Sequence, residues 1–414
     1  MSQPLSSPAA ASPSLAPDLQ DCWSGSGLRP LQLRGRSLLP IVQGGMGVGV
    51  SAQQLAGAVA SAGGMGTISS VDLRRLHPDL MARSAGPLGD PETKKRINDA
   101  NLEAIAREIG GARERAQGRG LVAINVMRAL DAYAESVKQA LACGVDAVVV
   151  GAGLPLDLPD LAQDHPDTLL VPILSDARGV QLLMRKWERK KRLPDAVVIE
   201  HPAHAGGHLG AARIADLPDG RFEFERVIPE CLAFFRQAGV EGRIPLIAAG
   251  GIRSHQDIRR LQDLGADAVQ LGTPFAVTEE CDAAPEFKRV LAEARDEDMV
   301  EFTSVAGLPA RAVRTPWLNA YLKVESKLQA VAQIKKRCTK AFDCLAQCGL
   351  RDGFKDWGQF CIDHQLAAAL RGDLSKGLFF RGKGALPFGD QVRSVMDLMK
   401  HLLTPLPSSA TAGA

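Results

Sequence analysis

The sequence contains no long apolar run, and its densest basic run, at 185–192, is interpreted as a solvated helix face. Within its 414 residues, no uninterrupted apolar stretch approaches the roughly 20 residues of a membrane-spanning helix. The N-terminus lacks the basic start and the apolar core of a secretory signal peptide. The net charge is only +2, and no basic run is interleaved with aromatic residues, which argues against nucleic acid as the main partner. We therefore expect a soluble, cytoplasmic protein with no membrane or nucleic-acid partner.

Closely spaced cysteine pairs are also missing. Four of the eight cysteines lie near the C-terminus, at Cys338, Cys344, Cys348 and Cys361, in the spacing C-x5-C-x3-C-x12-C. Zinc and iron–sulfur sites commonly contain C-x2-C pairs, and none occurs here. Buried structural thiols are therefore favoured over a metal site. In the cytoplasm the cysteines are expected to be reduced.

What the sequence does contain is a regular alternation of short apolar runs and amphipathic segments. The strand-like runs are 38–43, 63–68 (a loop and a strand), 121–127, 146–150, 168–174, 196–199, 244–249 and 266–271. Strands that alternate with helices indicate a parallel sheet. Eight such units over about 250 residues fit an α/β fold of the (β/α)₈, or TIM, barrel type. An open doubly wound sheet is the alternative, although it normally has fewer units.

The alternation also predicts the domain organisation. Residues 1–36 are rich in Ser, Pro, Ala and Gly and are expected to be a disordered tail that closes over the barrel near its end. Residues 37–320 form the barrel, with a long loop over 300–318. Residues 321–404 look mostly helical and form an additional C-terminal subdomain, and 405–414 are a frayed tail. Within the barrel, helices are expected over 51–62 (with Ser51 as N-cap), 94–117, 130–143, 178–192, 224–237 and 254–264.

Three histidines follow the sixth strand, at His201, His204 and His208. Gly206 and Gly207 have no Cβ, so a flat ligand can lie close to the backbone there. His208 comes just after them, at the end of the strand where barrel enzymes hold their chemistry. Its unperturbed pKa suits proton transfer near neutral pH, which makes His208 the candidate catalytic residue. The alternative is a simple turn that contains histidines by chance.

Two late glycine loops predict a phosphate site. Gly250 and Gly251 follow the seventh strand, and Gly272 and Thr273 follow the eighth. Barrels often bind phosphate with the loops after these two strands, through bare backbone N–H groups and a hydroxyl. The alternative is that both loops only permit tight turns.

A phosphate at one end and glycines after the first and sixth strands suggest a ligand that lies across the barrel mouth, and a flavin mononucleotide (FMN) has that shape. Gln43, Gly44, Gly45 and Met46 could surround its ring with small groups and backbone donors. Asn125 either contacts the flavin or substrate or caps its own loop. Ser175 and Asp176 either bond the ribityl chain or cap the next helix, and the cap is slightly favoured.

Taken together, these segments resemble the nitronate monooxygenase (2-nitropropane dioxygenase) family of FMN-dependent barrels. They are also similar to the related FMN-dependent enoyl-acyl-carrier-protein reductases. The segments that carry the resemblance are PIVQGGMG (40–47), GGMGT (63–67), NVM (125–127), AGGH (205–208), AAGGI (248–252) and QLGT (270–273). The resemblance implies FMN as cofactor, with its phosphate at Gly250, Gly251, Gly272 and Thr273, and His208 facing flavin and substrate.

The resemblance also implies an activity. In the monooxygenases of this family the histidine is the base for neutral nitroalkanes, and nitronates are oxidised with O2 to carbonyl compounds and nitrite. Where the family often has an acidic residue directly before Ala-Gly-Gly-His, this chain has His204, which leaves its substrate preference open. We expect His204 to face solvent, and a second polar contact is the alternative.

Two other functions stay open at this stage. An enoyl-thioester reductase that uses NAD(P)H would need a site for a second phosphate, and Arg311 and Arg314 could supply one. A flavin-binding barrel that acts as a subunit of a larger complex is the third hypothesis, suggested by the long C-terminal region. The oligomeric state is open, a homo-oligomer included.

Overall fold

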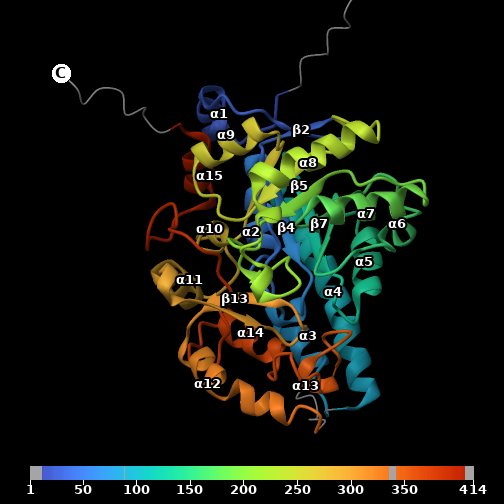
Figure 1. Cartoon of the computed structure of the whole chain (residues 1–414), viewed down its shortest axis with the longest axis vertical. Helices are drawn as coiled ribbons and strands as arrows, with labels where there is room; N and C mark the ends of the chain where they lie inside the picture. Colours follow the sequence, from blue (N-terminus) through green and yellow to red (C-terminus); the bar gives the residue numbers. More distant parts are fainter. Residues whose placement is uncertain (1–11, 88, 335–341, 406–414) are drawn as a thin grey trace, which may run out of the picture.

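The computed structural model describes residues 12–87, 89–334 and 342–405 (Figure 1). Eight parallel strands close into a barrel in the order β10-β11-β3-β4-β5-β6-β7-β8, which confirms the predicted (β/α)₈ fold. The strands are β3 (Ile41–Gln43), β4 (Met65–Ser69), β5 (Leu121–Met127), β6 (Ala147–Gly151), β7 (Leu169–Leu174), β8 (Val197–Glu200), β10 (Leu246–Ala249) and β11 (Ala268–Leu271). Each coincides with one of the eight predicted runs.

The two-residue period of these strands builds two layers of core. Alternate side chains such as Val42, Val149 and Val198 fill the barrel interior, and their neighbours, such as Ile41 and Val148, pack outward against the helices. Burying each of these side chains contributes roughly 1.5–3 kcal/mol. The helices of the barrel are α2 (Gln53–Ala62), α3 (Pro78–Arg83), α4 (Pro91–Ala116), α5 (Tyr133–Ala142), α6 (Leu158–Leu161), α7 (Ala177–Glu188), α8 (Phe224–Gln237), α9 (His255–Leu264), α10 (Thr273–Ala276) and α11 (Pro285–Glu293).

The helix cap predicted at Ser51 is wrong. Helix α2 begins after Ala52, and the Ser51 hydroxyl instead accepts from the Met46 N–H at 2.8 Å. The Asp282 carboxylate, which is distant in sequence, accepts from the N–H groups of Ala52, Gln54 and Leu55, and the Glu108 carboxylate accepts from that of Gln53. Ser254 does cap α9, in a reciprocal capping box with Asp257.

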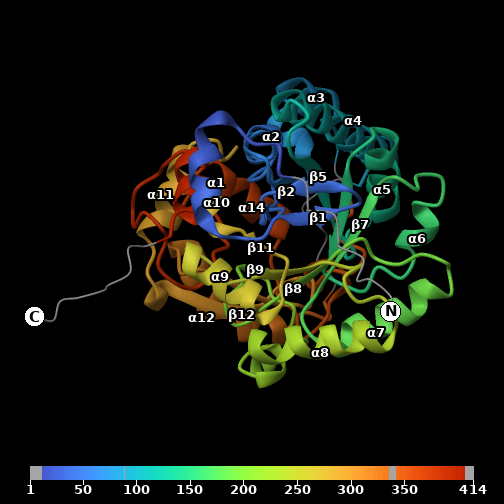
Figure 2. The same cartoon turned by 90° about the horizontal axis from the view of Figure 1, so that it is seen from above.

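The N-terminal residues form a plug at one end of the barrel. The expected disorder does not hold for α1 (Gln20–Ser26) or for the hairpin of β1 (Leu31–Leu33) and β2 (Arg36–Leu38). Residues 1–11 lie outside the described chain. Leu31 and Leu33 are buried in the same cluster as the barrel interior, so the hairpin closes the barrel, as Figure 2 shows from above. Apolar burial at these few positions outweighs the disorder-prone composition around them.

The long loop expected over 300–318 is wrong. Its residues form an antiparallel hairpin of β12 (Met299–Thr303) and β13 (Pro309–Val313), followed by α12 (Pro316–Ala330). Strand β13 also pairs with β9 (Gly207–His208), with Ala310 opposite His208. The pairing partner of β13 is about 100 residues away in the chain, so no local sequence pattern predicts this pairing.

The C-terminal part is helical only in segments. Its helices are α13 (Gly349–Asp352), α14 (Ile362–Leu370) and α15 (Val395–Leu403), and no helix occurs over 371–394. Helix α15 packs against α1, α2 and α9, and its side chains belong to the same apolar core as the barrel helices. The boundary predicted at residue 320 falls within α12. No helix within the described ranges is long and apolar enough to cross a membrane.

Candidate active site

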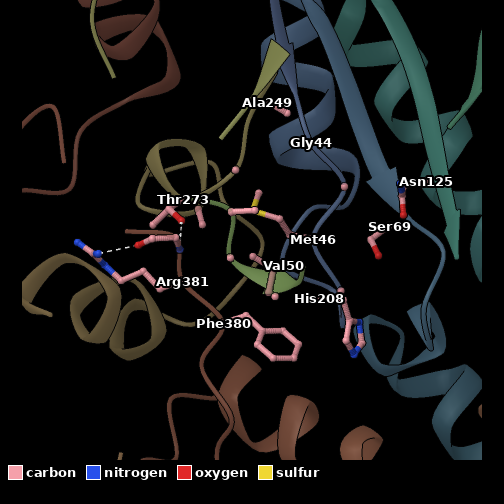
Figure 3. A pocket seen from close by; sticks show the side chains of 18 of the residues that line it. Gly44, Met46, Val50, Ser69, Asn125, His208, Ala249, Thr273, Phe380 and Arg381 are labelled. Carbon is pink, nitrogen blue, oxygen red and sulfur yellow. Dashed lines mark hydrogen bonds between the residues drawn. The ribbon is translucent and has the colours of Figure 1, made fainter. Parts of the chain in front are cut away.

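A cavity of about 290 Å³ opens at the carboxyl ends of the barrel strands (Figure 3). The inward-facing position at the end of several strands lines it: Ser69 from β4, Asn125 from β5, Glu200 from β8 and Gln270 from β11. The same alternation that puts apolar residues deeper in the barrel thus puts polar side chains at its mouth. A size near 300 Å³ and a mixed apolar and polar lining are typical of small-molecule sites.

His208 lies in this cavity and is held by the hairpin that the sequence did not predict. Its backbone pairs with β13, and its Nε2 lies 3.0 Å from the Ser304 hydroxyl. The Phe380 ring packs beside it, with 5.6 Å between ring centroids. Burial lowers the pKa of His208 to about 4, because the apolar surroundings disfavour the imidazolium. At neutral pH the side chain is therefore an uncharged imidazole, able to accept a proton.

The loop before His208 is anchored by a buried arginine. Arg311 is fully buried; it donates to the Ala205 carbonyl and forms an ion pair with Glu301 at 2.7 Å. A Cβ at Gly206 would come within 2.4 Å of the Gly382 nitrogen, so glycine is required there. Because Arg311 is occupied in this way and does not line the cavity, the predicted use of Arg311 for a substrate phosphate is wrong. Arg314, also named for that role, is exposed and does not line the cavity either.

The two predicted phosphate loops meet at one side of the cavity. Gly250, Gly251, Gly272 and Thr273 all line it, because β10 and β11 are adjacent parallel strands. Gly250 and Gly251 have φ angles of 109° and 76°, a region that favours glycine. The Thr273 hydroxyl accepts from the Gly382 N–H at 3.0 Å.

Arg253, which the sequence reading left without a role, also lines the cavity next to these loops. Within the described part of the chain its guanidinium makes no ion pair and no hydrogen bond, whereas the side chains of the other two cations of the lining have partners. Lys383 pairs with Glu301 at 2.9 Å, and Arg381 donates to backbone carbonyls such as that of Leu291. Arg253 is thus the cation best placed to meet an anionic ligand group.

The cofactor contacts predicted at the end of the first barrel strand, β3, lie in two places, the cavity and the barrel wall. Gly44, Gly45 and Met46 line the cavity, and a Cβ at Gly45 would lie 2.3 Å from Asn125 Cβ. Gln43 does not line it. Its amide accepts from the Thr67 N–H at 2.9 Å and donates to the Thr67 carbonyl at 3.1 Å, which bridges β3 and β4.

Of the other predicted cofactor contacts, Asn125 lies in the cavity and the pair Ser175–Asp176 does not. Asn125 lines the cavity, and its amide has no hydrogen bond to any described residue, so a ligand contact is favoured over a loop cap. Asp176 caps α7 by accepting from the Gly179 N–H at 2.7 Å. Neither Asp176 nor Ser175 lines the cavity, so the cap interpretation of that pair agrees with the geometry.

Glu200 is a cavity residue that sequence reasoning missed. Burial raises the pKa of its carboxyl to about 7, against a smaller lowering effect of Arg311. The sequence signal that could have identified Glu200 is its position as the last inward-facing residue of β8, two positions after Val198. His204, expected to face solvent, is exposed and lies at the cavity rim over Gly251.

The C-terminal part also reaches the cavity. Residues 380–386 run along its edge, and the carbonyl of His204 accepts from the Lys383 N–H at 3.1 Å. Of the four C-terminal cysteines, Cys344 lines the cavity, Cys348 and Cys361 do not, and Cys338 lies outside the described residues. Among the residues that the structure describes, no group of three or more His, Cys, Asp or Glu side chains could hold a metal ion.

Known proteins share this architecture. FabK from Thermotoga maritima has a TM-score of 0.62 at 21% identity, over 93% of this chain and 94% of that chain. A nitroalkane oxidase from Streptomyces ansochromogenes has a TM-score of 0.57, also at 21% identity, over 91% of this chain and 96% of that chain. At this level of identity the likeness concerns the fold.

Sequence comparisons narrow the family. A probable nitronate monooxygenase of Bacillus subtilis (strain 168) is 27% identical over 295 residues, 70% of this chain and 80% of that protein. A nitronate monooxygenase of Pseudomonas aeruginosa is 27% identical over 288 residues, 66% of this chain and 76% of that protein. The family model for nitronate monooxygenase matches residues 36–404. The chain therefore belongs to the nitronate monooxygenase family of oxidoreductases.

Proposed function

We propose that the protein is an FMN-dependent nitronate monooxygenase that oxidises alkyl nitronates with O2 to carbonyl compounds and nitrite. The observation that carries the proposal is the placement of His208 in one cavity with two glycine loops and the unpaired Arg253. Family membership supports the reaction class.

The residues present fit an FMN. A Cβ at Gly272 would meet only Met46 Sδ, at 3.8 Å, so the backbone there faces open space that a phosphate can enter. Arg253 would complement the phosphate charge. Gly44, Gly45 and the unpartnered amide of Asn125 would border the flavin ring. When bound, FMN would supply the electron transfer that links the substrate to O2.

His208 would handle the proton of the substrate. An uncharged imidazole can take the α-proton of a neutral nitroalkane, and the Ser304 hydroxyl holds the ring in place. With a pKa near 4, however, His208 is a weak base. The anionic nitronate needs no proton removal, so it is the expected substrate form, and neutral nitroalkanes should react more slowly.

An anaerobic titration of the purified protein tests the proposal. Propyl-2-nitronate and NADH are added to separate samples, and the visible absorbance of the flavin is followed. Loss of absorbance with the nitronate but not with NADH, and nitrite release once air is admitted, would support the monooxygenase. A protein without flavin absorbance would overturn the cofactor assignment.

An enoyl-thioester reductase that uses NAD(P)H is the second candidate. It is favoured by apolar side chains of the cavity lining, such as Val50, Leu130 and Leu366, which could hold an acyl chain. Rapid loss of flavin absorbance with NADH alone, followed by reoxidation with an enoyl thioester, would favour the reductase over the monooxygenase.

A further inference from the structure

The cavity lining contains two kinds of residue. Glycine loops follow β8, β10 and β11. The lining also contains apolar side chains that no predicted role explains. Three of them, Val50, Val71 and Leu130, come from the loops after β3, β4 and β5, and three, Leu345, Ile362 and Leu366, come from the C-terminal part. We call these six side chains the apolar wall.

Helix α14 presents a single face to the cavity. Ile362, Leu366 and Ala369 line it and lie four and three residues apart, so they share one side of the helix. Leu366 is only partly buried although it is apolar. Ile362 and Ala369 are buried in the apolar core, so Leu366 is the member of this stripe that the cavity leaves open to a ligand.

The wall is fixed to the barrel at both of its ends. Leu345 pairs with Leu130 through an isolated antiparallel bridge, and the Ala346 N–H donates to the Ala129 carbonyl at 3.0 Å. At the other end, Arg75 binds Asp363 of α14 at 2.7 Å and also pairs with Asp72. The carboxylate of Asp363, which also lines the cavity, is thereby compensated, so the wall stays apolar in character.

The wall lies next to the proposed reaction centre. In Figure 3, Val50 lies between Met46 and Phe380, and Phe380 lies beside His208; all four line the cavity. A substrate whose reacting carbon is at His208 can therefore extend its substituent along Val50 towards α14. A small nitronate such as that of nitroethane would leave the exposed parts of Val71 and Leu366 without an apolar partner.

We propose that the substrate carries an unbranched apolar chain of several carbons beyond its reacting group, and that this chain lies against the apolar wall. The proposal rests on the proposed function, because it places the reacting group at His208. An alkyl nitronate and an enoyl thioester share the chain, so both are tested. Each methylene buried should raise kcat/KM about fourfold until the wall is covered.

The test uses the FMN-loaded full-length enzyme. We would measure kcat/KM for the nitronates of nitroethane, 1-nitrobutane, 1-nitrohexane and 1-nitrooctane, and expect a rise of about fourfold per methylene. Leu366→Gln should flatten this rise. The matched control is Leu374→Gln, a leucine that is 42% exposed and does not line the cavity; it should keep the same chain-length dependence as the parent.

A binding measurement tests the apolar wall without requiring the enzyme to turn over a substrate. Butyrate and octanoate, which cannot react, are titrated into the enzyme in a calorimeter, and octanoate should bind at least tenfold more tightly. Should Leu366→Gln fail to fold, Leu366→Phe serves instead, since the larger side chain should abolish the advantage of octanoate while retaining an apolar wall.

Failure of the apolar-chain inference can be distinguished from failure of the proposed function. Equal kcat/KM along the nitronate series, with equal binding of the two carboxylates, would overturn the apolar-chain inference and leave the monooxygenase proposal standing. No turnover of any nitronate would overturn the proposed function. In that case a crotonyl and octenoyl thioester series with NADH tests the wall separately, and chain-length independence there would overturn the inference.

Discussion

His208 is the residue on which the proposed chemistry depends most directly. Replacing it by Ala should lower kcat/KM for neutral nitroethane by about 10²–10⁴-fold. The loss with the anionic nitronate should be smaller, because no proton has to be removed. The control is His165→Ala, which lies outside the cavity. A parent rate for neutral nitroethane in the His208 variant would contradict the role.

The lowered pKa of His208 predicts a pH profile. The imidazole accepts a proton only when uncharged, so kcat/KM for nitroethane should be constant above pH 6 and fall as the pH drops towards the pKa of about 4. An acid limb centred near pH 6.5 would instead mean that burial does not shift this residue. The measurement is a profile from pH 4 to 8, within the stable range of the enzyme.

Glu200 should make stability depend on pH. Its folded-state pKa of about 7 lies above its ordinary value of 4.5. Between these values the folded protein binds more protons than the unfolded chain, so stability contributed by Glu200 falls as pH rises through this window. Glu200→Gln should remove this loss and stabilise the protein at pH 8 by on the order of 1–3 kcal/mol.

Urea unfolding at pH 5 and pH 8 measures the Glu200 effect. The control is Glu241→Gln, whose side chain is 56% exposed and should change neither midpoint appreciably. An identical pH dependence in the parent and in Glu200→Gln would show that the carboxyl titrates in its ordinary range.

Arg253 is expected to matter for cofactor affinity. Loss of one charge-assisted hydrogen bond to a phosphate costs about 1.5–3 kcal/mol, so Arg253→Ala should weaken FMN binding roughly 10- to 150-fold. Titration of FMN into the flavin-free protein, followed by flavin fluorescence, gives the dissociation constant. Arg259→Ala, on the same stretch and 52% exposed, is the matched control; equal affinity in both variants would exclude Arg253 from the phosphate site.

At the scale of elements, the β12–β13 hairpin positions the loop that carries His208. Its Arg311 is fully buried and bound to Ala205 and Glu301. Arg311→Met leaves the Glu301 carboxylate and the Ala205 carbonyl with fewer partners, and should cost about 3–5 kcal/mol. Thermal unfolding measures the loss. Arg314→Met, an exposed change on the same segment, should alter stability by less than about 0.5 kcal/mol.

The elements that the sequence predicted well are those with a strong local period. The apolar run 121–127 coincides with β5, the run 146–150 differs from β6 by one residue at each end, and α8 spans 224–237 as expected. The β12–β13 hairpin was missed because β13 is buried on both faces and shows no alternation, and because its partner β9 has only two residues.

At the scale of the whole molecule, the C-terminal part and the barrel share one apolar core. Leu402 and Leu403 of α15 belong to the same cluster as Leu55 of α2 and Leu261 of α9. The protein should therefore unfold in one cooperative transition, with coincident fluorescence and circular dichroism midpoints. Two separate transitions would instead support an independent C-terminal subdomain with a boundary near residue 320.

The sequence by itself determined the barrel, because the strand and helix periods are local properties that each segment carries alone. It also determined which loops bear glycine and histidine at the strand ends. Only the tertiary structure decided the protonation and the contacts of those residues. The burial that keeps His208 uncharged, the occupation of Arg311 and the apolar wall all arise from contacts between segments far apart in the chain. Such contacts depend on packing across the whole fold, which no local pattern encodes.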